Sequence, residues 1–139
     1  MDTLQVGEFI IQYDRETTAQ AYRLTDQGDA DRCRCSYCRN FALQRPALYP
    51  ASFLRLLNEM GIDPSKEGEV FECGSEAGRH YYGGWLFLSG ELIQRGEHVK
   101  DGDFEYWFDD GYRPPPDVDF GEHRIVVEFL TKLPWVLDE

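Results

Sequence analysis

The stretch RHYYGGWLFLSGEL (residues 79–92) is dense in aromatic and apolar residues and predicts a long β-strand. A second run of the same kind, EVFECG (residues 69–74), precedes it in the chain. The segment GSEAG (residues 74–78) joins the two and supplies the glycines that a tight hairpin turn requires. We therefore expect an antiparallel hairpin, and with it an antiparallel sheet as the framework of the fold.

Further strand-like runs lie on both sides of this hairpin. EFIIQYD (residues 8–14), DFEYWFDD (residues 103–110) and EHRIVVEFL (residues 122–130) are rich in β-branched or aromatic residues. The segment AQAYRLT (residues 19–25) is expected to pair with the first of them. Together with the hairpin, these runs predict an antiparallel sheet of about five or six strands.

Helical patterns occupy the part of the chain before the hairpin. SYCRNFALQ (residues 36–44) contains good helix formers and predicts a short helix that ends before Pro46. A longer helix begins near Pro50, because a proline at the first turn loses no helical hydrogen bond. Gly61 ends this helix, and its apolar face comprises Phe53, Leu54, Leu57 and Met60.

These patterns predict an α+β fold in which a short helical, cysteine-bearing insertion, at about residues 32–61, interrupts the sheet. The sequence contains no Pro/Gly/Ser-rich linker, internal repeat or low-complexity tract. We expect a single domain over residues 1–139, with a zinc-knuckle-like helical insertion over residues 29–61. Its 139 residues, 42% of them hydrophobic and 14% aromatic, suffice to bury a core.

The N-terminal segment MDTLQVGEF (residues 1–9) lacks the basic and apolar regions of a secretion signal. No apolar run reaches the roughly 18 to 20 residues that a membrane-spanning helix needs. We therefore expect a cytoplasmic protein. In the cytosol thiols are kept reduced, so clustered cysteines indicate metal or redox chemistry more often than disulfides.

The charge of the chain is strongly negative but unevenly distributed. The net charge is −12, from 14 basic and 26 acidic residues. Residues 32–58 contain no acid and carry +5, so the remaining nine bases and 26 acids carry −17. This balance makes nucleic acid and anionic membranes poor partners and suits a basic protein. The five arginines of the positive segment are Arg32, Arg34, Arg39, Arg45 and Arg55.

Three cysteines lie within six residues of one another, in the order Cys33, Cys35 and Cys38. Cys35 and Cys38 form a Cys-x-x-Cys pair, which has the spacing of a zinc knuckle. Cys33 points to the same side of the chain as Cys35 if the chain is extended between them. A closed structural zinc site requires a fourth ligand. Cys73 is the preferred candidate because it leaves no thiol unexplained, and His80, which faces it across the hairpin, is the alternative.

Other interpretations of the cluster stay open. The run Cys-x-Cys-x-x-Cys-x-Asn-Phe (residues 33–41) is similar to zinc-knuckle loops in general, without indicating a particular family. Neighbouring arginines could compensate the charge of a zinc–thiolate centre, but they would also favour reactive thiolates in a redox-active site. An iron–sulfur cluster and simple packed thiols are further alternatives. The HExxH and HxE…PCxxC signatures of catalytic zinc are missing.

A small enzyme is the remaining type of interpretation. Tyr81, Tyr82 and Trp85 could line a groove beside a β-bulge at Gly83-Gly84, although a core strand explains the same residues more simply. The nearby acids that could perform acid–base chemistry are Glu105, Asp109 and Asp110, of which the last two fit a turn. The proline run at residues 114–116 is expected to form a rigid loop rather than a recognition element.

The sequence thus predicts a small cytoplasmic binding protein, stabilised by a structural Zn²⁺ ion on Cys33, Cys35, Cys38 and Cys73 or His80. Its acidic surface would bind a basic protein, for example as an inhibitor that covers a basic nuclease. The alternatives are a thiol-based redox sensor with releasable zinc and a small enzyme built around residues 80–85. Nucleic-acid binding through the five arginines would require a contiguous basic patch.

Overall fold

The computed structural model describes residues 1–115 and 118–139, and it confirms the α+β class. Within these residues a seven-stranded antiparallel sheet is combined with four helices. The elements in chain order are β1 (Asp2–Val6), β2 (Phe9–Tyr13), α1 (Arg15–Arg23), α2 (Asp29–Cys33), α3 (Ser36–Gln44), α4 (Ala51–Met60), β3 (Glu69–Glu76), β4 (Arg79–Gln94), β5 (Val99–Asp101), β6 (Phe104–Asp109) and β7 (Arg124–Pro134). The last residue of the proline run expected to form a rigid loop, at position 116, lies outside the described part of the chain.

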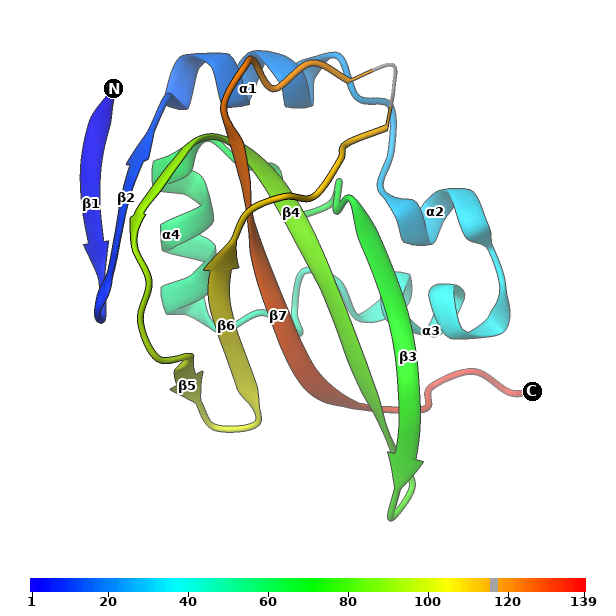
Figure 1. The fold of residues 1–139 in the computed structure, drawn as a ribbon. Helices are drawn as coiled ribbons and strands as arrows, with labels where there is room; N and C mark the ends of the chain where they lie inside the picture. The colour runs from blue at the N-terminus through cyan, green and yellow to red at the C-terminus, as the bar shows by residue number, and fades with distance from the viewer. Residues whose placement is uncertain (116–117) are drawn as a thin grey trace.

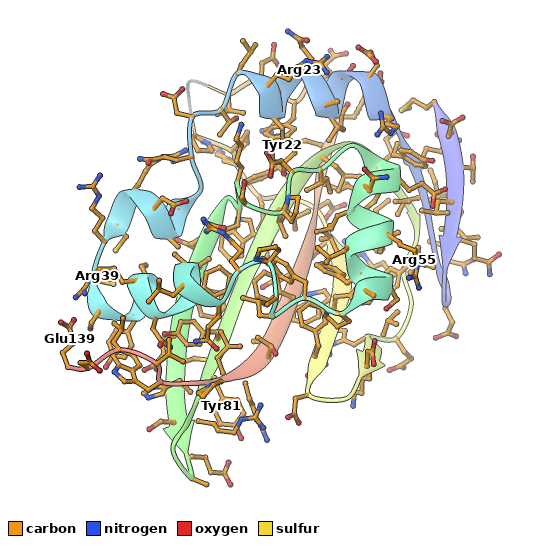
Figure 2. The ribbon with its side chains drawn as sticks, turned by 180° about the vertical axis from the view of Figure 1, so that it is seen from behind. Tyr22, Arg23, Arg39, Arg55, Tyr81 and Glu139 are labelled. Carbon is orange, nitrogen blue, oxygen red and sulfur yellow. The ribbon has the colours of Figure 1, made fainter. Side chains whose placement is uncertain are left out.

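Strand β4 is the centre of the sheet. It pairs with β7 from Arg79 to Ser89, with β3 through its first half, and with β2 through its last residues. The sheet therefore has the order β1-β2-β4-β7-β6-β5, with β3 beside the first half of β4. Figure 1 shows helices α3 and α4 behind the sheet, and Figure 2, seen from the opposite side, shows them in front of it.

The core lies between the sheet and these two helices. Phe53 of α4 packs on Phe104 of β6 with ring centroids 4.8 Å apart, and Phe104 stacks on Phe129 of β7 at 5.7 Å. Phe41 of α3 stacks on the same Phe129 ring. A Cβ atom on Gly84 would lie 2.4 Å from the carbonyl oxygen of Glu69, so this position of β4 requires glycine.

Several sequence predictions are confirmed in detail. The two helices at residues 36–44 and near Pro50 are α3 and α4, and α4 ends at Gly61, which has the left-handed φ of 82°. The predicted hairpin is β3–β4, and its turn lies at Ala77-Gly78. None of the helices in the described ranges has the length and apolarity needed to cross a bilayer.

The prediction that residues 19–25 form a strand paired with residues 8–14 is wrong. Most of that segment belongs to helix α1, whose buried residues Thr18, Ala21 and Tyr22 have helical rather than alternating spacing. Strand β2 pairs instead with β4 and with β1, a short strand that the sequence analysis did not identify. Long-range contacts hold the helix: the Tyr22 hydroxyl donates to the Phe87 carbonyl at 2.6 Å.

Asp14 begins helix α1 as its N-cap. Its carboxylate accepts hydrogen bonds from the backbone N–H and the hydroxyl of Thr17, at 3.0 and 2.8 Å. The backbone hydrogen bond, followed by the side-chain one, lowers the pKa of Asp14. The lowered folded-state pKa means that this cap adds stability above the unfolded-state pKa of about 4.

We predict that Asp14→Ala lowers the free energy of unfolding by about 1 kcal/mol at neutral pH, because the first turn of α1 loses its acceptor. The difference from the native protein should shrink as the pH falls below about 4 and through the lowered folded-state pKa. Urea unfolding followed by circular dichroism at several pH values measures it. Asp14→Asn is the control, since asparagine keeps the cap without the titration.

Candidate metal centre

Two helices meet at the cysteine cluster. Cys33 is the last residue of α2, Cys35 is the N-cap of α3, and Cys38 lies in the first turn of α3. The three sulfur atoms lie within 4.8 Å of one another. A zinc ion with Zn–S bonds near 2.3 Å places tetrahedral sulfur ligands about 3.8 Å apart. The cluster therefore has the dimensions of a site for a thiolate-binding metal ion.

The chain between Cys33 and Cys35 forms a turn. It is not the extended stretch on which the sequence argument for a shared side depended. Arg34, the residue between them, has the left-handed φ of 58°, which is unfavourable for a residue with a side chain. This turn ends α2 and brings both sulfur atoms to one side of the chain. The convergence of Cys33 and Cys35 thus depends on one strained backbone position.

The thiols of the cluster differ in their surroundings. Cys33 and Cys35 are exposed, whereas Cys38 is buried, with 5% of its surface accessible. The backbone N–H of Cys38 donates to the Cys35 sulfur at 3.4 Å and lowers the pKa of that thiol. Burial raises the pKa of the Cys38 thiol. A cation at this point would stabilise all three as thiolates, because metal binding displaces their protons.

Neither candidate for the fourth ligand belongs to this group of converging side chains. Cys73 lies in a bulge of β3 between Glu72 and Ser75, is exposed, and has its sulfur 3.5 Å from the Tyr81 carbonyl oxygen. His80 lies in β4 opposite Ser75. Its Nδ1 atom is 3.2 Å from a carboxylate oxygen of Glu72.

The two candidates differ in their contacts with α3. Cys73 lies in the bulge, where the alternation of side chains is interrupted, and the contact that its sulfur makes is with the Tyr81 carbonyl of the hairpin. The ring of His80 lies 6.2 Å from that of Tyr37 in α3. Trp135, beyond β7, contacts both rings, with centroids 5.0 Å from His80 and 5.6 Å from Tyr37.

Helix α3 is fixed to the sheet by Asn40, which is fully buried. Its amide nitrogen donates to the Pro134 carbonyl at 3.1 Å and to the Tyr82 hydroxyl at 3.3 Å. Its amide oxygen accepts from the Val136 backbone N–H at 2.8 Å. The Tyr82 hydroxyl in turn donates to the Tyr37 carbonyl at 2.7 Å. Sequence reasoning missed this residue, because only the partners in β4 and after β7 reveal its role.

Helix α2 is fixed by the carboxylate of Glu67, whose side chain is fully enclosed. One oxygen accepts from the Ala30 backbone N–H at 2.9 Å, and the other pairs with Arg45 at 2.7 Å. Arg45 also pairs with Asp31 at 2.6 Å. Each end of the cysteine segment is thus held by a buried polar side chain.

The five arginines of the positive segment do not form one basic patch. Arg45 is used in the buried ion pairs, and Arg39 pairs with Glu139 of the C-terminal tail. Figure 2 shows Arg39 and Arg55 on opposite sides of the molecule. Arg32 and Arg34 are exposed and donate to main-chain carbonyls. In the described part of the chain no arginine donates to a cysteine sulfur, so the expected arginine–sulfur hydrogen bonds are not observed.

The aromatic groove, offered as an alternative to a core strand, does not form. Tyr81 and Trp85 lie on one face of β4 and Tyr82 on the other, where it is fully buried. The β4 ladder runs through Gly83-Gly84 without a shift in register, so the bulge of that alternative is not observed. The simpler interpretation, a core strand, is the one observed.

The nearby acids are engaged in ion pairs. Asp109 and Asp110 both pair with Arg95, at 3.0 and 2.9 Å. Glu105 lies 3.0 Å from His98. This arrangement gives no support to the predicted acid–base pair, because each carboxylate already has a cationic or imidazole partner.

No family model, curated protein or solved structure matches this chain. The chemistry of the site must therefore be argued from its own residues. Three converging thiols, one of them at a helix N-terminus, can bind a soft metal ion or exchange electrons as thiol and disulfide.

We predict that Asn40→Ala lowers the free energy of unfolding by about 2 to 4 kcal/mol, because the buried amide that bonds to Tyr82, Pro134 and Val136 is removed. Urea unfolding of the native protein and the variant measures the loss. Gln44→Ala is the matched control: its amide also donates to Pro134, but from an exposed contact, and the expected loss is below about 1 kcal/mol. Equal losses in the two variants would contradict the anchoring role of Asn40.

Proposed function

We propose that Cys33, Cys35 and Cys38 bind one Zn²⁺ ion and that the protein is a zinc-stabilised binding module. The observation that carries the proposal is the convergence of the three sulfur atoms within 4.8 Å. Zinc is the favoured metal because it accepts thiolate ligands in tetrahedral geometry and the cysteines have knuckle spacing. An iron–sulfur cluster would require a further cysteine nearby, and Cys73 does not belong to the converging group.

For the fourth ligand, we infer that His80 is better placed than Cys73. Its ring lies 6.2 Å from that of Tyr37 in α3, whereas the sulfur of Cys73 contacts the Tyr81 carbonyl of the hairpin. The Glu72 carboxylate holds Nδ1 of His80 at 3.2 Å, which leaves Nε2 for a metal ion. Zinc-binding histidines commonly have such a carboxylate partner. A water molecule would complete the tetrahedron if His80 does not.

The metal would act locally in this protein. Phe53, Phe104 and Phe129 pack the aromatic core between the sheet and α4, and Asn40 and Glu67 already hold α3 and α2. Zinc would therefore stabilise the junction around Arg34, where the left-handed turn brings the thiols together. Removal of zinc should loosen residues 29–44 rather than unfold the whole chain.

We infer that a basic protein is the partner of this module. The net charge of −12 would accelerate association with a positively charged surface and repel nucleic acid. An inhibitor that covers a basic nuclease is the specific form of this idea. Affinity for such a partner should fall steeply with rising salt, and the same affinity at all salt concentrations would count against it.

We predict that protein purified without chelators carries one zinc ion per chain, as measured by native against denaturing mass spectrometry. Cys35→Ser should lose the ion while keeping the α3 cap, because serine also caps a helix. Cys73→Ser should keep it, and His80→Ala should bind it more weakly. Hydrogen exchange after chelation should increase within residues 29–44. Four freely alkylated thiols with no bound metal would overturn the proposal.

A redox sensor is the second candidate, because Cys35 combines exposure with a lowered pKa and has two sulfur atoms within 4.8 Å. Two thiolates would reduce a peroxide to two water molecules, taking up two protons, and would form a disulfide as zinc leaves. The sensor predicts zinc release at about one equivalent of hydrogen peroxide. A purely structural site should keep its zinc under that treatment, followed with a colorimetric zinc indicator.

A further inference from the structure

A second candidate site lies at the opposite end of β4 from the hairpin. A groove of about 450 Å³ opens between the end of β4, the segment that follows β6, and the start of β7. In Figure 1 the segment after β6 crosses in front of β4 at this level. The residues that line the groove and enter the argument are Glu91, Asp110, Tyr112, Arg113, His123 and Arg124.

Two guanidinium groups line this groove without an acceptor among the described residues. The Nε atom of Arg124 is enclosed by protein and has no hydrogen-bond partner. Within residues 1–115 and 118–139, neither Arg124 nor the exposed Arg113 forms an ion pair. Because the Nε–H of Arg124 is enclosed, an incoming acceptor would bind the Nη groups of this residue and the guanidinium of Arg113.

The carboxylates beside these arginines mostly contact other groups. Glu91 lies 3.3 Å from Nδ1 of His123, and Asp110 pairs at 2.9 Å with Arg95, which also pairs with Asp109. Glu122, at the exposed rim, is the remaining acid of the groove lining. The positive charge of the two arginines is therefore not cancelled by a direct ion pair, even in a protein of net charge −12.

The wall of the groove is held in place before any ligand arrives. The Tyr112 hydroxyl donates to Glu128 at 2.6 Å, and its ring packs edge-on against Trp85 with centroids 4.7 Å apart. The backbone N–H of Gly90 donates to the His123 carbonyl at 2.9 Å, which joins β4 to the residue before Arg124. A ligand here would find its donors largely preorganised.

From these contacts we propose that Arg113 and Arg124 bind the oxyanion group, carboxylate or phosphate, of a small molecule. A guanidinium presents a planar fork that matches either group with two parallel hydrogen bonds. Arg124 would contribute its Nη–H groups, and Arg113 would close the groove from the exposed side. This site is separate from the cysteine cluster and does not depend on zinc.

Binding of inorganic phosphate and of succinate, each titrated at constant ionic strength, tests the site by ¹H–¹⁵N NMR. We expect saturable chemical-shift changes of the Gly90 and Gly111 amide signals and of the Arg124 Nε–H signal. The probe that binds more tightly identifies the preferred oxyanion. Arg124→Gln should weaken binding by about tenfold or more, since a charge-assisted pair is lost. Arg124→Lys should restore it only in part, because lysine keeps the charge without the fork.

Two further variants keep the test decisive. Arg113→Gln changes an exposed residue that the fold does not need, and it should also weaken binding of the preferred probe. Arg55→Gln makes the same charge change on α4, away from the groove, and should bind the probe as the native protein does. Shifts that do not saturate, or binding that Arg113→Gln and Arg124→Gln leave unchanged, would overturn the proposal.

Discussion

The fold depends on the pairing of strand β4 along both of its edges. Its backbone groups are bonded to β7 over Arg79–Ser89, and β3 and β2 divide the other edge between them. Because buried backbone groups must be hydrogen-bonded, this long strand dictates where its neighbours lie. Its buried face, with Tyr82, Leu86 and Leu88, then defines the side on which α3 and α4 pack. The cysteine segment enters the fold as part of that covering layer.

Two buried polar side chains connect this layer to the sheet. Asn40 joins α3 to the chain after β7, and Glu67 joins α2 and Arg45 to the start of β3. They hold the helices that carry Cys33, Cys35 and Cys38, whose three sulfur atoms converge. The strained turn at Arg34 is the part that a bound ion would stabilise most directly.

The arginines of this acidic protein have several different roles. Arg45 neutralises buried and half-buried carboxylates, Arg95 pairs with two surface acids, and Arg39 holds the C-terminal tail. Arg113 and Arg124 lack such partners in the described part of the chain and face a groove. Net charge therefore describes the long-range field of the molecule, whereas the short-range chemistry is set by which cations remain unpaired.

Local sequence patterns determined much of this protein: the β3–β4 hairpin, helices α3 and α4, the strands around β6 and β7, and the grouping of three cysteines. Each follows from spacing or turn chemistry within a dozen residues, which acts wherever the segment lies in the fold. Tertiary structure alone decided that residues 19–23 are helical, because Thr18 and Tyr22 bond to β4. It also left Cys73 outside the group of converging cysteines and divided the arginines between buried pairs and open surface. These outcomes depend on strand register and long-range partners, and neither is encoded in the local periodicity of the chain.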